Sequence, residues 1–525
     1  MKRHYRCLNS ISTKVGTCLN TIIRTVFLCG LLGACVENSV SEHSSRNLYS
    51  DFALIETSPP AHLSVQAIAS RDSSLVTPLL NGDQAFLAWL ETLNSAHKTI
   101  DVQTFIYSDD EVGRTVGDVL VRAADRGVVV RLLIDDFFHY IQGSDLSQLD
   151  AHERIEVRVF NPFNRKLPPP INYLTEYRTV DGRMHNKATI VDSRKSIVGG
   201  RNVADEYFRR DQNQYFSDFD VLLQGDIVRG VQSSFDAFWD DKRSVAYSRV
   251  ITAESARRRR SNSDKVQADK INAVHVAPLG RKLKQSIQGS VSLPKFKASG
   301  TVRFDSPQKL DRVATSVAQM ATDSLLQSIA GSQESVVIVT PYFVPDEVHS
   351  AMLAELANQG ISVTIFTNSL GATNHASVHP GYMRHRKKLL AAGVQIFEHR
   401  EDVRIAFENS EGRHQSRVMI HSKMTLVDGR YLLAGSLNFD PRSIHKNTET
   451  LVMLDSPELV ELLDLKLQMK IRDHSYQVSI SEDDELIWSS ANEYDEILTN
   501  SEPVGSLINS TVSLLFSLVP PGFSL

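Results

Sequence analysis

Two short stretches of the chain combine a histidine and a lysine with the same residues downstream. Each histidine, His185 and His421, is followed by lysine two positions later, aspartate at seven, glycine at fourteen and asparagine at seventeen. One such pattern is already improbable in a sequence of this composition, and a second copy with the same downstream residues is far less probable. The repetition therefore indicates an internal duplication that carries chemistry.

The residue types in the repeat suit chemistry at a phosphate group. Histidine and lysine two positions apart on a strand share one face, so Lys187 and Lys423 place an ammonium beside each imidazole. Asn202 and Asn438 can donate amide hydrogens to the same oxygens. Two such faces brought together would supply one imidazole to attack phosphorus and another to protonate the leaving oxygen. The lysines and amides would stabilise the five-coordinate phosphorus centre.

This chemistry needs no metal ion or other cofactor. The sequence has no cluster of Asp, Glu and His residues with an obvious metal-ligand spacing. All four cysteines lie in the first 35 residues, so no thiolate metal site and no intrachain disulfide can form beyond them. We therefore expect a site without metal or cofactor.

The elements that must position the two motifs are also repeated. In each half an apolar run predicts a strand, a helical stretch ends at a glycine, and two further strands follow. The expected strands are 100–107, 128–134 and 155–160 in the first half and 336–343, 361–366 and 394–397 in the second, with helix stops at Gly127 and Gly360. Because alternating strands and helices predict βαβ units, we expect two similar α/β halves side by side.

The amino-terminal region predicts an export signal. No acidic residue precedes Cys35, and the apolar run 26–34 is too short to span a bilayer comfortably. The sequence LGAC at 32–35 resembles the lipobox of bacterial lipoproteins, in which the cysteine becomes the lipidated first residue. We expect a signal peptide at 1–34 and a lipid anchor at Cys35, which would place the protein in the cell envelope facing the periplasm. An uncleaved signal anchor or a misinterpreted hydrophobic start is the alternative.

Composition divides the remaining chain into five parts. We expect a polar tether at 35–55, a first domain at 56–250, a basic linker at 251–305, a second domain at 306–475 and a carboxyl-terminal extension at 476–525. The basic run in the linker is either solvated or in contact with anionic lipid headgroups. The apolar tail from Val504 either docks onto the body or inserts into a membrane interface.

The net charge argues against nucleic acid as a partner. The whole chain carries a formal charge of −5, and removal of a leader with five basic and no acidic residues would make it −10. Non-specific binding to nucleic acid requires a basic surface. We therefore expect no nucleic-acid partner.

Both motifs resemble the HKD motif of the phospholipase D superfamily, which reads His-x-Lys-x4-Asp followed by Gly-[Gly/Ser]-x-Asn. The resemblance covers roughly residues 70–250 and 310–470. It implies two phospholipase D-like α/β sandwich domains related by pseudo-two-fold symmetry, with one shared active site and a covalent phosphohistidine intermediate. It suggests His185 as the nucleophile and His421 as the general acid, although the near-symmetry of the two motifs allows the reverse.

Other motif positions acquire expected roles from the same resemblance. In this superfamily the motif aspartates are chiefly structural, which would apply to Asp192 and Asp428. Gly200 and Ser436 occupy the [Gly/Ser] position close to the motif asparagine, and we expect them to contribute to substrate binding.

The carboxylate that orients each histidine normally comes from a later strand in this superfamily. Glu449 follows His421 by 28 residues, and Asp218 aligns with Glu449 once one gap is allowed. Asp220 lies on the same strand face as Asp218 and is its rival for orienting His185. Such a carboxylate would accept a hydrogen bond from Nδ1 and leave Nε2 for phosphorus.

Longer segments resemble the cardiolipin synthase branch of the superfamily, and its type C-like proteins in particular. The matching segments are SPPAHLS (58–64), AADRGVVVRLLIDD (123–136), NPFNR (161–165), RMHNK (183–187), IVGGRNVADEYF (197–208) and LAGSLNFDPRS (433–443). The resemblance implies a phosphatidyltransferase that moves a phosphatidyl group from a glycerophospholipid to phosphatidylglycerol at a membrane surface, giving cardiolipin. Water as acceptor would make the same site a phospholipase D.

The predicted export departs from the usual pattern of these synthases, which lie at the inner membrane. A lipid-anchored, exported form would meet lipid at the periplasmic face or beyond. This difference makes hydrolysis or headgroup exchange the alternative reaction, and a peripheral inner-membrane location the alternative place. A nucleic-acid phosphodiesterase is disfavoured by the acidic charge, and a non-catalytic envelope protein by the two intact motifs.

Overall fold

The computed structural model describes residues 74–138, 146–164, 181–250, 293–311, 319–409, 412–490 and 498–504, together with Ser513. All of them belong to one compact unit, His62–Leu525. The expected signal peptide, Cys35 and the tether lie outside the described residues, as do residues 251–292 of the expected linker and most of the apolar tail. No helix within the described ranges is long and apolar enough to cross a membrane.

The first half is built on a mixed sheet whose strands run in the order β9-β4-β3-β2-β5-β6-β8-β1. Only β2, β3 and β4 are parallel to one another. The strands are β1 (Ser74–Leu79), β2 (Thr99–Thr104), β3 (Val129–Asp135), β4 (Ile155–Phe160), β5 (Ala188–Val191), β6 (Lys195–Gly199), β8 (Asp220–Gln224) and β9 (Ser244–Ala246). The helices are α3 (Gly82–Asn94), α4 (Glu111–Asp125), α6 (Ser147–Asp150), α9 (Val228–Trp239) and α10 (Tyr247–Val250).

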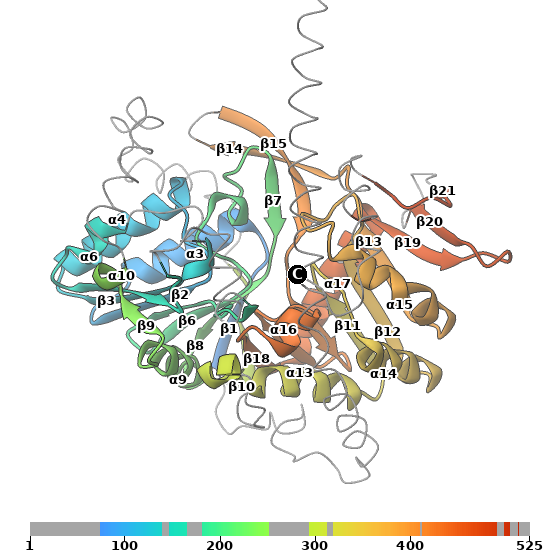
Figure 1. Ribbon diagram of the computed structural model, residues 1–525, viewed down its shortest axis with the longest axis horizontal. Helices are drawn as coiled ribbons and strands as arrows, with labels where there is room; N and C mark the ends of the chain where they lie inside the picture. Colours follow the sequence, from blue (N-terminus) through green and yellow to red (C-terminus); the bar gives the residue numbers. More distant parts are fainter. Residues whose placement is uncertain are drawn as a thin grey trace, which may run out of the picture. The chain divides into compact units, whose positions relative to one another are not determined.

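The second half repeats this order as β13-β12-β11-β16-β17-β18 and extends it beyond β13. Its strands are β11 (Ser335–Val339), β12 (Ser362–Asn368), β13 (Gln395–His399), β16 (Met424–Val427), β17 (Tyr431–Gly435) and β18 (Thr450–Asp455), followed by β19 (Ser475–Ile480), β20 (Leu486–Ser490) and β21 (Leu498–Thr499). Its helices are α13 (Met320–Ala330), α14 (Glu347–Asn358), α15 (His379–Ala391), α16 (Pro441–His445) and α17 (Pro457–His474). The two similar α/β halves expected from the repeat are confirmed (Figure 1).

A single strand, β10 (Phe296–Phe304), joins the two sheets into one. Its first residues pair with β1 and the rest pair with β18, both antiparallel. The structure differs here from the expected linker, which placed these residues outside both domains. Apolar and polar residues alternate strictly from Lys295 to Phe304, which is the period of a strand with one buried face. The basic composition of the segment concealed that signal.

The hydrophobic core forms three clusters across the molecule. One lies under α3 and α4 in the first half, and another lies under α13, α14 and α15 in the second. The middle cluster combines α9 and α17, which come from different halves, with strands of both sheets. Because apolar burial is worth roughly 25 cal/mol per Å², this shared cluster ties the halves together independently of any polar contact.

The helix stops expected from sequence are confirmed. The helices α4 and α14 each end two residues before a glycine, which is Gly127 with φ of +98° in the first half and Gly360 with φ of +88° in the second. Glycine adopts this left-handed conformation without the steric cost of a Cβ atom. The expected strands 100–107 and 336–343 end earlier, at Thr104 and Val339. Beyond these ends, Tyr107 forms an isolated parallel bridge with Val203, and Phe343 forms one with Phe439.

A separate three-stranded sheet connects the halves above the site. It consists of β7 (Gln214–Ser217) from the first half and β14 (Arg404–Asn409) and β15 (Gly412–Ile420) from the second. The strands β7 and β15 run parallel, side by side, between the two halves (Figure 1). Parallel pairing across the halves brings the residues that follow both strands to the same place.

The motif aspartates hold strands in place. Asp192 Oδ1 accepts hydrogen bonds from the backbone N–H groups of Lys98 (2.7 Å) and Thr99 (2.9 Å), at the start of β2. Asp428 Oδ1 does the same for Glu334 (2.8 Å) and Ser335 (3.1 Å), at the start of β11. Both aspartates have φ of +53°, which an Asp side chain tolerates better than most. These contacts fix the starts of β2 and β11, and the structural role expected for the two aspartates stays a prediction.

We predict that Asp192→Ala lowers the free energy of unfolding by about 1–2 kcal/mol, because the backbone donors lose a partly exposed, charged acceptor. Those N–H groups hold the pKa of Asp192 below its usual value despite some burial. The stabilisation is therefore present above the unfolded pKa of about 4 and is lost as the pH falls through the lower folded pKa. Urea unfolding at several pH values measures it. Asp118→Ala, on the exposed face of α4, is the control, and equal effects of the two substitutions would contradict the role.

Candidate active site

A parallel bridge between the halves places His185 beside Glu449. Met184 and Thr448 form this bridge, in which the His185 N–H donates to the Thr448 carbonyl and the Thr448 N–H donates to the Arg183 carbonyl, both at 3.0 Å. His185 and Glu449 are the next residues on the two segments. The backbone pairing therefore sets their side chains next to one another.

The same construction occurs on the other side of the site. The pairing of β7 with β15 ends at Ser217 and Ile420, and the next residues are Asp218 and His421. The His421 N–H donates to the Ser217 carbonyl at 3.0 Å, as His185 does to Thr448. Each histidine thus follows a segment of its own half that pairs in parallel with a segment of the opposite half.

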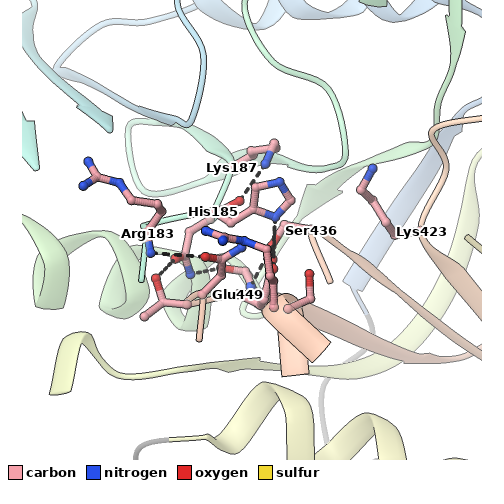
Figure 2. A network of polar contacts seen from close by, with 12 residues as sticks. Arg183, His185, Lys187, Lys423, Ser436 and Glu449 are labelled. Carbon is pink, nitrogen blue, oxygen red and sulfur yellow. Dashed lines mark hydrogen bonds and ion pairs between the residues drawn. The ribbon is translucent and has the colours of Figure 1, made fainter. Parts of the chain in front are cut away.

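Each histidine contacts a carboxylate from the opposite half. His185 Nδ1 lies 3.0 Å from both Glu449 oxygens, and Figure 2 shows the two side chains joined by dashed lines. His421 Nδ1 lies 2.5 Å from Asp218 Oδ2. All four residues are at most 8% exposed. The expectation that Asp218 or Asp220 orients His185 is wrong, because Asp218 contacts His421 and Asp220 pairs with Arg201 at 2.9 Å.

The spacer residues of the two motifs strengthen the contact between the halves. Asn186 Nδ2 donates to Thr450 Oγ1 at 2.8 Å, and Thr448 Oγ1 donates to Asn186 Oδ1 at 2.7 Å. Ser422 Oγ donates to the Ser217 carbonyl at 2.9 Å. The motif leaves this position unspecified, so sequence reasoning missed both residues.

Two further residues missed from sequence hold the backbone in front of each histidine. Asp135, at the end of β3, accepts the Met184 N–H at 3.0 Å. Asn368, at the equivalent end of β12, accepts the Ile420 N–H at 2.9 Å. Their common position at a strand end was visible in the repeat, but neither residue lies within a recognised motif.

The carboxylates determine which nitrogen of each histidine carries the proton. Although burial acts to raise the pKa of Glu449 and of Asp218, the neighbouring imidazole and lysine charges outweigh it, so both pKa values lie below the usual range. An ionised carboxylate only accepts, so Nδ1 must be the donor and Nε2 carries the lone pair. Burial and the charge of Lys423 lower the pKa of His421 to about 3, and burial lowers the pKa of His185. Both imidazoles are neutral before substrate binds.

The two lysines supply positive charge beside the imidazoles. Lys187 Nζ donates to the His185 carbonyl at 2.7 Å, and Lys423 Nζ lies 2.8 and 3.1 Å from the two ring nitrogens of His421. Burial lowers the pKa of Lys187 to about 7 and that of Lys423 to about 8, and each lysine is close enough to oppose protonation of the histidine on the other side. All four groups therefore belong to one site that attracts an anion.

The two motif asparagines differ in their surroundings. Asn202 Nδ2 donates to the Tyr207 hydroxyl at 2.8 Å, and its Oδ1 accepts the Ile106 N–H at 3.1 Å. Asn438 is 7% exposed, and its Oδ1 has no hydrogen-bond partner among the described residues. Asn438 therefore offers an acceptor without a partner among the described residues, whereas the expectation that both residues donate amide hydrogens to a substrate stays a prediction.

The [Gly/Ser] positions support the carboxylates. Ser436 Oγ donates to Glu449 Oε2 at 2.5 Å and accepts the Thr450 N–H at 3.0 Å (Figure 2). A Cβ atom at Gly200 would lie only 2.2 Å from Asp218 Oδ1. The substrate contact expected of both residues stays a prediction, while the observed contacts serve to hold Glu449 and to leave space for Asp218.

Aromatic rings from the first half contact both imidazoles. Phe105 meets the His185 ring edge-on at 5.1 Å between centroids. Tyr207 and Phe216 contact the His421 ring at 5.2 and 5.0 Å. These rings exclude water from the faces of both histidines, in keeping with their low exposure. Within the described residues, no group of three His, Cys, Asp or Glu side chains is placed to hold a metal ion.

The family description "Cardiolipin synthase, PLD-like domain" matches residues 89–239 and 325–470, which contain both histidine motifs. The chain belongs to the phospholipase D superfamily, in its cardiolipin synthase branch. It is 33% identical over 459 residues to "Cardiolipin synthase C" of Escherichia coli (strain K12), covering 84% of this chain and 94% of that protein. It is 26% identical over 391 residues to "Cardiolipin synthase 1" of Bacillus anthracis, covering 74% of this chain and 65% of that protein.

A solved structure shares the fold. The crystal structure of phosphatidylserine synthase from Haemophilus influenzae Rd KW20 matches with a TM-score of 0.50 at 16% identity, covering 77% of this chain and 87% of that chain. The family membership makes this chain a phospholipase D-type enzyme. The site shared by the two α/β halves contains both histidine motifs and is the candidate for its active site.

We predict unequal effects at the two equivalent [Gly/Ser] positions. Gly200→Ala should lower kcat by about 100-fold, because the added Cβ displaces Asp218 from His421 and misplaced catalytic groups lose roughly that factor. Ser436→Ala removes one hydrogen bond to Glu449 and should cost about 10-fold. Steady-state kinetics on variants with wild-type circular dichroism measures both. Wild-type kcat in Gly200→Ala, or a larger loss in Ser436→Ala, would contradict the role given to these positions.

Proposed function

We propose that this enzyme is a cardiolipin synthase-like phosphatidyltransferase that acts on glycerophospholipids through a covalent phosphohistidine intermediate. One observation carries the proposal: two neutral imidazoles, each oriented by a buried carboxylate, lie with two buried lysines in a single site. The relatives named cardiolipin synthases support a phospholipid donor and phosphatidylglycerol as the acceptor. The lipid anchor expected at Cys35 and a periplasmic location belong to the same proposal, since they would hold the site at a membrane.

The first step of the proposed reaction transfers the phosphatidyl group to the enzyme. The lone pair of His185 Nε2 attacks phosphorus, the bond from phosphorus to the headgroup oxygen breaks, and His421 Nε2 gives its proton to that oxygen. Lys187 and Lys423 stabilise the charge on the non-bridging oxygens. The headgroup leaves as an alcohol.

The second step reverses the first with a new alcohol. His421 Nε2 takes the proton of the acceptor hydroxyl, the acceptor oxygen attacks phosphorus, and the bond to His185 Nε2 breaks. Phosphatidylglycerol as acceptor gives cardiolipin, and water gives phosphatidic acid. The step conserves the phosphodiester when an alcohol is used, so no external energy source is needed.

His421 Nε2 must take up a proton from solvent when substrate binds, before His421 can act as an acid. The pKa of His421 is about 3 in the free site because of burial and Lys423. An anionic phosphodiester lying against Lys423 offsets the charge that depresses this pKa. Protonation of His421 is therefore coupled to phosphate binding, which limits proton transfer to the occupied site.

The reaction is tested by the products formed from labelled phosphatidylethanolamine with and without phosphatidylglycerol. We expect cardiolipin only when phosphatidylglycerol is present, and product formation that persists in EDTA because the steps use side chains alone. His185→Ala and His421→Ala should each remove turnover. Phosphatidic acid in both mixtures with no cardiolipin would establish a phospholipase D instead. No lipid product in either mixture would contradict the proposal altogether.

The roles of the two histidines are distinguished by a leaving group that needs no proton. With a phosphatidyl donor whose headgroup is p-nitrophenol, His421→Ala should release a stoichiometric burst of nitrophenol, because only the acid is missing. His185→Ala should release none, because no phosphohistidine can form. Stopped-flow absorbance measures the burst, and the opposite pattern would assign the nucleophile to His421.

A further inference from the structure

The two halves present different chemistry next to the shared site. The strands β2 and β11 are equivalent, and the threonines Thr104 and Thr340 occupy matching positions at their ends. The next two residues are phenylalanine and isoleucine in the first half, and Pro341 and Tyr342 in the second. A substrate with two similar sides would require no such difference between the halves. A substrate with one apolar and one polar side requires a site whose two sides differ in the same way.

The first half offers an aromatic cluster made of Phe105, Phe137 and Phe138. The three rings contact one another, with centroid distances of 5.4 Å from Phe105 to Phe138, 5.3 Å from Phe137 to Phe138 and 6.3 Å from Phe105 to Phe137. All three are partly exposed, and Phe105 touches the His185 ring. This surface suits the apolar part of a lipid.

The second half offers hydrogen-bonding groups instead, in a polar cluster made of Tyr342, Asn374, His375 and Asn438. Asn438 is brought to the cluster by the next residue, Phe439, whose N–H donates to Thr340 Oγ1 at 3.2 Å. The Tyr342 hydroxyl donates to Asn374 Oδ1 at 2.8 Å, and its ring meets His375 edge-on at 5.3 Å. Asn374 and His375 are exposed, so a ligand can reach them. Hydroxyl, amide and imidazole groups together suit a ligand with several hydroxyls.

The polar cluster lies on the side of His421. Asn368 Nδ2 donates to the Pro341 carbonyl at 3.2 Å and to the Ile420 carbonyl at 2.9 Å. Because Tyr342 follows Pro341 and His421 follows Ile420, this one side chain holds the two residues near each other. In keeping with that position, Asp218, the partner of His421, adds to the larger effect of burial in raising the pKa of Tyr342.

Asn438 adds a buried acceptor without a partner. Its Oδ1 makes no hydrogen bond among the described residues, although the side chain is only 7% exposed. In the equivalent Asn202, Oδ1 accepts the Ile106 N–H and Nδ2 donates to the Tyr207 hydroxyl. A buried polar atom left unpaired is costly, so a ligand that donates a hydroxyl hydrogen there gains affinity.

We propose that Tyr342, Asn374, His375 and Asn438 form the subsite for the alcohol, which receives the departing headgroup and then the polyhydroxyl acceptor that replaces it. The aromatic cluster faces the apolar remainder of the phosphatidyl group. This inference rests on the proposed function and adds to it the orientation of the phospholipid in the site. In-line attack by His185 sends the leaving oxygen away from His185 and toward His421, which is the side of the polar cluster.

The subsite has a defined effect on the second step. Water and an alcohol compete for the same phosphohistidine, so the ratio of transfer product to phosphatidic acid reports how well the alcohol is held. That ratio does not depend on how fast the phosphohistidine forms. A residue that binds the alcohol must therefore change the ratio, whatever its effect on the overall rate.

The test uses the full-length protein, a fixed concentration of labelled phosphatidylethanolamine in mixed micelles, and free glycerol as the titrated acceptor. Tyr342→Phe, Asn374→Ala and His375→Ala should each lower the ratio of phosphatidylglycerol to phosphatidic acid by about 3- to 10-fold, as expected for loss of one hydrogen bond. The glycerol concentration needed for half-maximal transfer should rise by the same factor.

Two controls make the outcome specific. Phe138→Leu, in the aromatic cluster, should change the dependence on donor chain length but leave the product ratio as in the wild type. Lys466→Ala, on the exposed face of α17, should change neither. An unchanged ratio in all three polar-cluster variants, or an equal fall in Phe138→Leu, would overturn the subsite while leaving the lipid activity intact. A wild-type protein that forms neither product would overturn the proposed function itself.

Discussion

The active site depends on parallel backbone pairing between the two halves. The bridge of Met184 with Thr448 and the pairing of β7 with β15 are the two places where this pairing occurs beside the histidines. Each pairing sets a histidine of one half against a carboxylate of the other. Neither half alone contains an oriented histidine, so the proposed catalytic groups are assembled only when the halves are docked.

Because the site needs both halves in register, it depends on the many apolar and polar contacts between them. The middle hydrophobic cluster, strand β10 and the hydrogen bonds of Asn186 and Ser422 all act across the same boundary. Small relative movements of the halves would separate both histidine–carboxylate pairs at once. The two buried carboxylates and two buried lysines are mutually compensating charges, and removing one member of such a set typically costs about 3–5 kcal/mol.

Much of the fold could be predicted because its signals are local. Apolar runs defined the strands, glycines such as Gly127 marked helix ends, and the repeated motif located the two histidines and lysines. The exchange of carboxylates could not be predicted, because the repeat places Glu449 after His421 in sequence whereas the orienting contact is made across the halves. The equivalent positions of Asp218 and Glu449 in the repeat identified the two carboxylates that contact the histidines. Only the three-dimensional pairing decides which histidine each carboxylate faces.

The remaining differences have the same origin. The alternation in β10 was present in the sequence but lay in a basic, serine-rich region that favoured a linker. Asn202 bonds to Tyr207, whereas Asn438 Oδ1 finds no partner in the part of the chain that the structure describes, and no spacing rule identifies the neighbours that cause this difference. Near-identical motifs therefore acquire different properties from their surroundings, and the two sides of the site differ in their hydrogen-bonding groups.

The most direct test of the exchanged pairs is nitrogen-15 NMR of the two active-site imidazoles, assigned by His185→Gln and His421→Gln, in Glu449→Gln and Asp218→Asn variants. An exchanged arrangement predicts that Glu449→Gln changes the tautomer signals of His185 and leaves those of His421, while Asp218→Asn changes His421 and leaves His185. If instead Asp218→Asn altered His185 and Glu449→Gln altered His421, each carboxylate would serve its own half and the account of the site would be wrong.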